Sequence, residues 1–114
     1  MLDWRRLSVR YGRLGWQQRL GNLASTLSRT ATISESRQST TSVPDLLREG
    51  MWIIEWSAPD APVDVAAELV PMQLELGLLS QAWARDPHAV RPILAFRART
   101  MSDRVLELSG LLNT

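Results

Sequence analysis

The sequence contains no cysteine, which excludes disulfide bonds and thiolate chemistry. Histidine occurs once, as His88, in a turn flanked by proline, and a zinc site normally needs several histidine or cysteine ligands. The phosphate-binding glycine loops and the strained turn around a nucleophilic serine are also missing. We therefore expect no catalytic residue, no metal and no cofactor, and interpret the chain as a non-enzymatic protein with His88 in solvent.

Long apolar runs are missing as well, since the longest extend over only a few residues, as in Met51–Ile54. A transmembrane helix needs about 20 apolar residues, and the first residues lack the apolar segment of a secretory signal. Apolar residues make up 45% of the 114 residues and charged residues 22%, which is typical of one globular domain. These features predict a single cytoplasmic domain over residues 1–114.

Lysine is absent too, so all basic side chains are arginines, and they are unevenly placed. Residues 1–34 carry six arginines and one acid, whereas residues 35–114 carry seven arginines and eleven acids. The N-terminal arginines alternate with aromatic residues and include Arg5, Arg6, Arg10 and Arg13. This pattern favours either an anionic membrane surface or pairing with acids of the same or another chain. The acidic remainder makes a nucleic-acid module unlikely.

What is present is helical periodicity, with apolar residues spaced three and four apart. We expect helices within residues 3–32, 43–57, 60–84 and 87–109, joined by short connections at 58–60 and 85–87. Short connections make neighbouring helices antiparallel. The predicted fold is all-α, an up-down bundle of three to four helices, with a Ser/Thr-rich loop at about 33–42 and residues 1–15 as a loose basic arm or a separate short helix.

The helix starts and the prolines give finer expectations. Ser42 and Asp60 are expected to cap the helices that follow them, and Gly110 to end the last helix. The fourth segment has a stripe of three heptads: Val65, Leu69, Met72, Leu76, Leu79 and Trp83. Because the stripe keeps its phase across Pro71, we expect one kinked helix there. Pro92 predicts a short turn at 87–90 followed by a helix from 92. The last helix has its own stripe: Val90, Leu94, Ala98, Met101, Val105 and Leu108.

Charged and aromatic side chains supply the candidate binding surfaces. Asp60, Asp64, Glu68 and Glu75 recur along one helix and predict a solvated acidic face, since the Glu-x-x-His pattern of di-metal bundles is absent. Helix 43–57 is apolar on most sides, so Trp52 and Trp56 cannot easily both join its other apolar stripe in the core. We therefore propose Trp52 and Trp56 as partner-binding residues, because tryptophan is enriched at interface hot spots.

Three stretches, taken together, resemble a known family: Leu20–Leu27 (LGNLASTL), Ile53–Asp60 (IIEWSAPD) and Arg104–Leu112 (RVLELSGLL). They are similar to a family of small, functionally uncharacterised cyanobacterial proteins. The stretches cover about a quarter of the chain and none is specific to a chemistry. The resemblance implies a cytoplasmic protein of a photosynthetic bacterium, and it supplies no activity, cofactor or site residue.

Three functions remain open at this point. The first is a helical interaction or assembly protein that binds an unidentified protein partner, or a second copy of itself, through the Trp52 and Trp56 face. The second is a peripheral protein held on a membrane or other anionic surface by Arg5, Arg6, Arg10 and Arg13. The third is an enzyme or ligand carrier with a pocket lined by His88 and an acid or arginine.

Overall fold

The computed structural model describes residues 2–36 and 42–113, and this part of the chain is helical without a strand. Five α-helices follow one another: α1 (Trp4–Gly12), α2 (Trp16–Glu35), α3 (Val43–Ser57), α4 (Val63–Arg85) and α5 (Pro87–Ser109). Two 3-10 turns, Ala58–Asp60 and Leu111–Asn113, complete the described structure. The predicted all-α class is confirmed, but the predicted count of three to four helices is wrong, because residues 3–32 divide into two helices.

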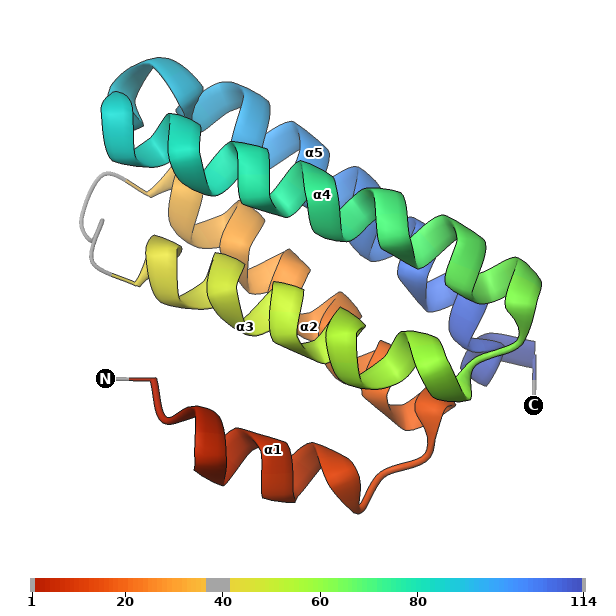
Figure 1. Cartoon of the computed structure of the whole chain (residues 1–114). Helices are drawn as coiled ribbons and strands as arrows, with labels where there is room; N and C mark the ends of the chain where they lie inside the picture. The colour runs from red at the N-terminus through yellow and green to blue at the C-terminus, as the bar shows by residue number, and fades with distance from the viewer. Residues whose placement is uncertain (1, 37–41, 114) are drawn as a thin grey trace.

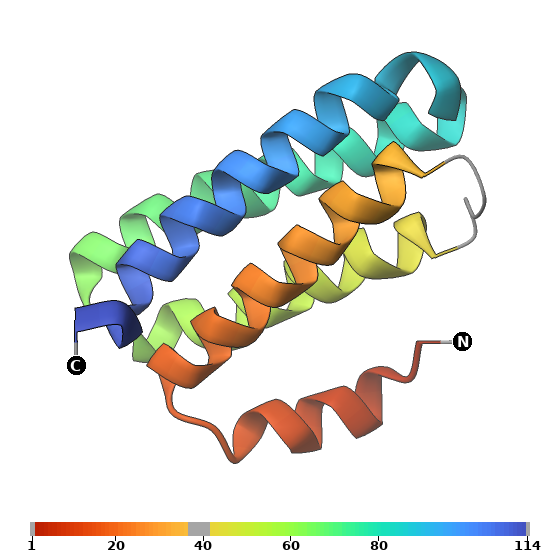
Figure 2. The same ribbon diagram turned by 180° about the vertical axis from the view of Figure 1, so that it is seen from behind.

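Helices α2 to α5 form an up-down bundle in which each helix runs antiparallel to the next (Figure 1). Helix α2 packs against α3 and α5, and α4 packs against the same two helices from the opposite side. The reverse view shows α2 and α5 side by side (Figure 2). Helix α1 lies outside this bundle, alongside α3. The first residues are therefore a separate helix rather than a loose arm.

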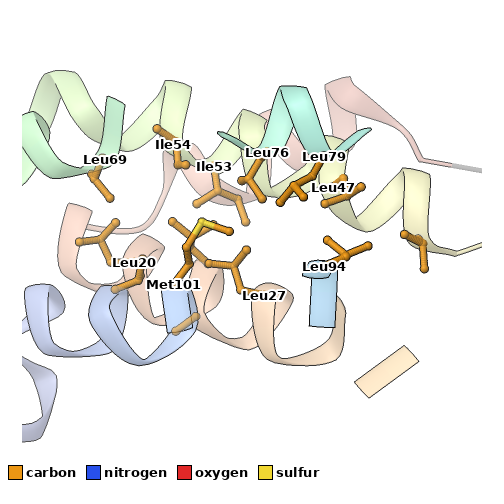
Figure 3. Packing of buried hydrophobic residues seen from close by; sticks show 14 of the residues in the cluster. Leu20, Leu27, Leu47, Ile53, Ile54, Leu69, Leu76, Leu79, Leu94 and Met101 are labelled. Atoms are coloured by element: carbon orange, nitrogen blue, oxygen red, sulfur yellow. The ribbon is translucent and has the colours of Figure 1, made fainter. Parts of the chain in front are cut away.

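The core lies between the four long helices and consists almost entirely of aliphatic side chains. Figure 3 shows leucines of α2 and α4 meeting isoleucines of α3 and Met101 of α5. Leu20, Leu69, Leu76 and Leu94 have no exposed surface. Burial of each such side chain contributes about 1.5–3 kcal/mol. Both predicted stripes face this core, with only Met72 of α4 and Leu108 of α5 partly exposed.

Two prolines lie inside helices without ending them. Helix α4 continues through Pro71 as expected, and Pro71 is exposed. Helix α5 begins at Pro87 and continues through Pro92, so the predicted turn at 87–90 is wrong. The reason is a strong cap, since the Asp86 carboxylate accepts a hydrogen bond from the Ala89 amide at 3.2 Å.

Other helix ends differ from expectation in informative ways. Ser42 precedes α3, yet its side chain makes no capping hydrogen bond. Asp60 does not cap α4, which begins at Val63, because Asp60 lies in the preceding 3-10 turn. Gly110 ends α5 with φ of 71°, as predicted. Helix α2 extends to Glu35, and residues 37–41 of the expected loop lie outside the described residues.

Within the described residues, no helix combines the length and apolar character that crossing a bilayer requires.

Candidate interaction surfaces

Arg19 joins the ends of three elements at one buried point. Its Nε donates hydrogen bonds to the carbonyl oxygens of Tyr11 and Leu14, each at 2.9 Å. Its Nη1 donates to the Trp56 carbonyl oxygen and, at 2.7 Å, to the Asp60 carboxylate. A guanidinium suits this position because carbonyls at helix C-termini lack intrahelical partners and carry partial negative charge. Arg19 therefore fastens the end of α1 to the end of α3.

The Trp52 and Trp56 side chains, which we call the tryptophan face, are covered in part by α1. The Trp56 ring lies 6.3 Å from the ring of Trp4, 5.7 Å from that of Tyr11 and 6.2 Å from that of Trp52. These centroid distances lie in the range of favourable aromatic pairs. Both tryptophans are half-buried, and Trp4 remains 49% exposed. The tryptophan face is thus occupied, at least in part, by this chain's own N-terminal helix.

Tyr11 anchors α1 with both its ring and its hydroxyl. The residue is 2% exposed, and the hydroxyl donates to Oε1 of Glu49 at 3.2 Å. Burial and the adjacent Glu49 carboxylate together raise the pKa of Tyr11 to about 12, because both oppose formation of the phenolate. The other Glu49 oxygen lies 4.0 Å from Arg29 of α2. Tyr11 thereby connects α1 to α3, with α2 close to the same carboxylate.

The four N-terminal arginines are exposed, three of them on α1 and Arg13 directly after its end. Within the described residues, the guanidinium groups of Arg5, Arg6 and Arg13 have no acidic partner, and that of Arg10 lies over the Tyr11 ring at 5.7 Å. Arg19 is the one arginine of this basic region that binds the acidic series, through Asp60. Within the described part of one copy of the chain, the N-terminal arginines other than Arg19 therefore do not pair with the acidic series.

The acidic series is divided rather than continuous, because arginines from two helices bind its members separately. Glu75 binds Nε and Nη2 of Arg97 at 2.6 and 2.8 Å, and Glu68 binds Arg104 in the same two-point manner. These hydrogen bonds lower the pKa of both carboxyl groups from the usual 4.5. Glu68 and Glu75 keep 41% and 31% of their side-chain surface exposed while they join α4 to α5, and Asp64 is exposed, so the acidic series borders solvent with two of its carboxylates paired to arginines.

His88 lies exposed in the first turn of α5. The described residues contain no group of three or more His, Cys, Asp or Glu side chains placed to hold a metal ion.

A surface that the sequence analysis missed runs along α4 on the side opposite its core stripe. Val70, Leu74 and Leu78 are 55%, 68% and 57% exposed, and with Gln73, Gly77 and Gln81 they line a shallow hollow of about 440 Å³. We call these six residues the outer face of α4. The signal was available, because Val70, Leu74 and Leu78 recur every four residues. The heptad stripe on the other side of the same helix is the longer apolar pattern and by itself accounts for burial of α4.

Comparison of the chain with known protein families, with curated proteins and with solved structures found no match. The resemblance to small cyanobacterial proteins stays a prediction.

Proposed function

We propose that this chain is a non-enzymatic helical interaction or assembly protein, and that its principal docking surface is the outer face of α4. The single observation that supports the proposal is the exposure of Val70, Leu74 and Leu78 in one row on a long, regular helix. Large apolar side chains gathered in this way are typical of protein-binding surfaces. A partner helix could place its own apolar stripe along them.

The charges of α4 support the same surface. Between Asp64 and Arg85, the helix carries only two charged residues, Glu68 and Glu75. Both are held by arginines of α5 at the α4–α5 junction. The six residues of the outer face of α4 are therefore uncharged, and at the edge toward α3 Gln73 donates a hydrogen bond to the Glu55 carboxylate at 2.9 Å. An apolar partner centred on Val70, Leu74 and Leu78 would leave that carboxylate at the polar rim of the interface.

The tryptophan face is the weaker candidate for a partner because α1 already occupies part of it. A partner that docked on Trp56 would have to displace Trp4 and Tyr11 and lose the Tyr11–Glu49 hydrogen bond. We expect Trp52 and Trp56 to hold α1 in place. Their use as a docking site stays a proposal that requires α1 to leave.

The proposal is tested by capture from the protein's own cells with a tagged chain, followed by mass spectrometry. The variant is Leu74→Arg, and the matched control is Ser28→Arg, at an exposed position of α2 across the bundle. We expect a stoichiometric partner, or an untagged copy of the same chain, with wild type and Ser28→Arg but not with Leu74→Arg. Equal recovery with all three proteins would contradict the proposal.

A second candidate function is attachment to an anionic surface through α1. The observation that favours it is the contrast between Arg5, Arg6 and Arg13, which lack acidic partners in the part of the chain that the structure describes, and the paired arginines of α5. Exposed Trp4 beside them is the arrangement expected of a helix that lies at a lipid surface.

Flotation with vesicles tests this second function. Binding to vesicles that contain anionic lipid should decrease as salt rises, because each arginine near the surface contributes about 1 kcal/mol by electrostatics. A variant with Arg5, Arg6, Arg10 and Arg13 changed to glutamine should stay with the soluble fraction. Failure of the wild type to float at low salt would exclude this function.

A further inference from the structure

We infer that the partner of the outer face of α4 is a second copy of this chain, bound with its α4 antiparallel to the first. This inference rests on the proposed function and adds the identity and the orientation of the partner. Along α4, the exposed apolar residues and the terminal charges are placed so that two antiparallel copies centred at Leu74 complement each other.

The apolar residues are arranged symmetrically around Leu74. Val70 precedes Leu74 by four residues and Leu78 follows by four, and both are exposed on the same side of the helix. In an antiparallel pair centred at Leu74, the two Leu74 side chains meet at the two-fold axis and each Val70 meets a Leu78. A self-complementary patch of this kind is what a two-fold interface requires.

The charges at the two ends select the antiparallel direction. Asp64 lies ten residues before Leu74 and Arg85 eleven residues after it, and both are exposed. At 1.5 Å per residue they lie about 15 Å on either side of the centre, so each Asp64 approaches the Arg85 of the other copy. A parallel pair would instead place Asp64 near Asp64 and Arg85 near Arg85. Neither Asp64 nor Arg85 has an ion-pair partner among the described residues of its own chain.

The shape of the surface and its surroundings fit a helix pair. The hollow beside Leu74 is lined by Gly77 and two glutamines, and it can take a leucine side chain from the facing helix. On α5, Ile93 and Phe96 are 58% and 68% exposed. They are further exposed apolar side chains on the helix that Arg97 joins to Glu75 of α4, and a second copy that reached them would also cover that ion pair. A stable dimer buries about 800 Å² on each copy, more than one row of side chains supplies, and α5 adds to it.

The absence of cysteine makes a symmetric cross-link the sharpest test. Packed helices lie about 8–10 Å apart, which places the Cα atoms of directly facing residues about 3.4–5.4 Å apart, and at the wider spacings this falls within the range that a disulfide spans. Leu74→Cys should therefore form a disulfide-linked dimer when mildly oxidised at micromolar concentration. Ser28→Cys, on the other side of the bundle, is the matched control and should stay monomeric. Cross-linking of Leu74→Cys no faster than Ser28→Cys would overturn the inference.

Charge reversal tests the direction of packing with the natural Leu74 in place. Asp64→Arg should weaken the dimer about tenfold in sedimentation equilibrium, because two attractive pairs become repulsive. The double variant Asp64→Arg/Arg85→Asp should restore the wild-type affinity. In a parallel pair Asp64→Arg would only exchange one contact between like charges for another, and at a different surface it would change nothing. An affinity that Asp64→Arg leaves unchanged would therefore contradict the antiparallel arrangement, and so would a double variant that stays as weak as Asp64→Arg.

Failure of this inference can be told apart from failure of the proposed function. If the wild type is monomeric but captures a partner that Leu74→Arg does not bind, the outer face of α4 is a docking surface and its partner is another protein. The proposed function would then hold and the dimer inference would be wrong. If the wild type is monomeric and Leu74→Arg captures the same proteins as the wild type, both the proposed function and the dimer inference would be wrong.

Discussion

The tryptophan face of α3 and the outer face of α4 are both apolar surfaces that the four-helix core does not use. The first is met by α1, whose Trp4 and Tyr11 pack against Trp56 while Arg19 holds the adjoining chain. The second has no covering element among the described residues, and Leu74 is 68% exposed there. Both helices thus carry more apolar side chains than the core takes up. On α3 the additional side chains pack against α1, and on α4 they remain exposed and available to a partner.

The difference comes from what lies next in the sequence. Helix α1 carries aromatic residues on one side and is joined to α2 by the short segment 13–15, so it can fold back only over a nearby surface, which α3 provides. Helix α4 has no comparable spare helix beside it, because α3 and α5 are already in the bundle. An apolar helix face is therefore a candidate docking surface only after the segments that could cover it have been placed.

The largest effect should come from removing Arg19. Arg19→Ala deletes hydrogen bonds to three carbonyl groups and to Asp60, and should lower the free energy of unfolding by about 3 kcal/mol in urea titrations. Trypsin should then cut after Arg5 to Arg13 more rapidly, because α1 is no longer fastened. Arg29→Ala, at an exposed arginine of the same helix, is the control and should change stability little. A loss no larger than that of Arg29→Ala would show that Arg19 does not fasten α1.

The next largest effect directly compares the two surfaces. Trp56→Ala should lower the free energy of unfolding by about 2 kcal/mol, because it removes the ring contacts with Trp4, Tyr11 and Trp52. The loss should be smaller than for substitution of a fully buried tryptophan, because Trp56 is only half-buried. Leu74→Ala should change the stability of the monomer by less than about 0.5 kcal/mol, because the side chain is mostly in solvent. Thermal unfolding at low protein concentration measures both. If the two variants lost similar amounts of unfolding free energy, the tryptophan face and the outer face of α4 would be buried to a similar extent, which would contradict the comparison.

A smaller effect concerns the ion pair beside the outer face of α4. The pKa of Glu75 is lowered in the folded protein. The ionised carboxylate therefore contributes to the free energy of unfolding above pH 4.5, and this contribution is lost as the pH falls below that value. Glu75→Gln should lower stability at pH 7 by about 0.5–1 kcal/mol, since the pair is two-point but partly exposed. The variant should also lose less stability than wild type between pH 5 and pH 3, which are about one unit on either side of the usual carboxyl pKa. Parallel pH profiles for the two proteins would contradict this assignment.

Much of the bundle could be predicted from the sequence because apolar spacing determines which side of a helix is buried. The stripe from Val65 to Trp83 predicted α4 and its continuation through Pro71, and Gly110 predicted the end of α5. Capping was less predictable, since a serine or an aspartate can bond to many donors. Asp60 binds Arg19, which is distant in sequence, instead of the helix that follows.

The surfaces were harder to predict because they depend on contacts between segments far apart in the chain. Nothing in the spacing of Trp52 and Trp56 indicated that Trp4 and Tyr11 would fold back on them. Likewise, Glu68 and Glu75 gave no sign of their arginines, which lie 36 and 22 residues further along the chain. Val70, Leu74 and Leu78 were visible in the sequence, but their exposure became evident only once the core had been filled by the opposite stripe.

Titration of the single tyrosine tests most directly the claim that α1 is docked on α3 through Tyr11 and covers the tryptophan face. Tyr11 is the only tyrosine, so phenolate absorbance reports on it alone, with circular dichroism to verify the fold at each pH. Its raised pKa means that Tyr11 stabilises the docked helix fully below pH 10, and that this contribution is lost as the pH rises toward 12. We expect ionisation near pH 12 in the folded protein and near 10 in urea. A folded protein whose tyrosine ionises near pH 10 would contradict the account, because α1 would then be free of α3.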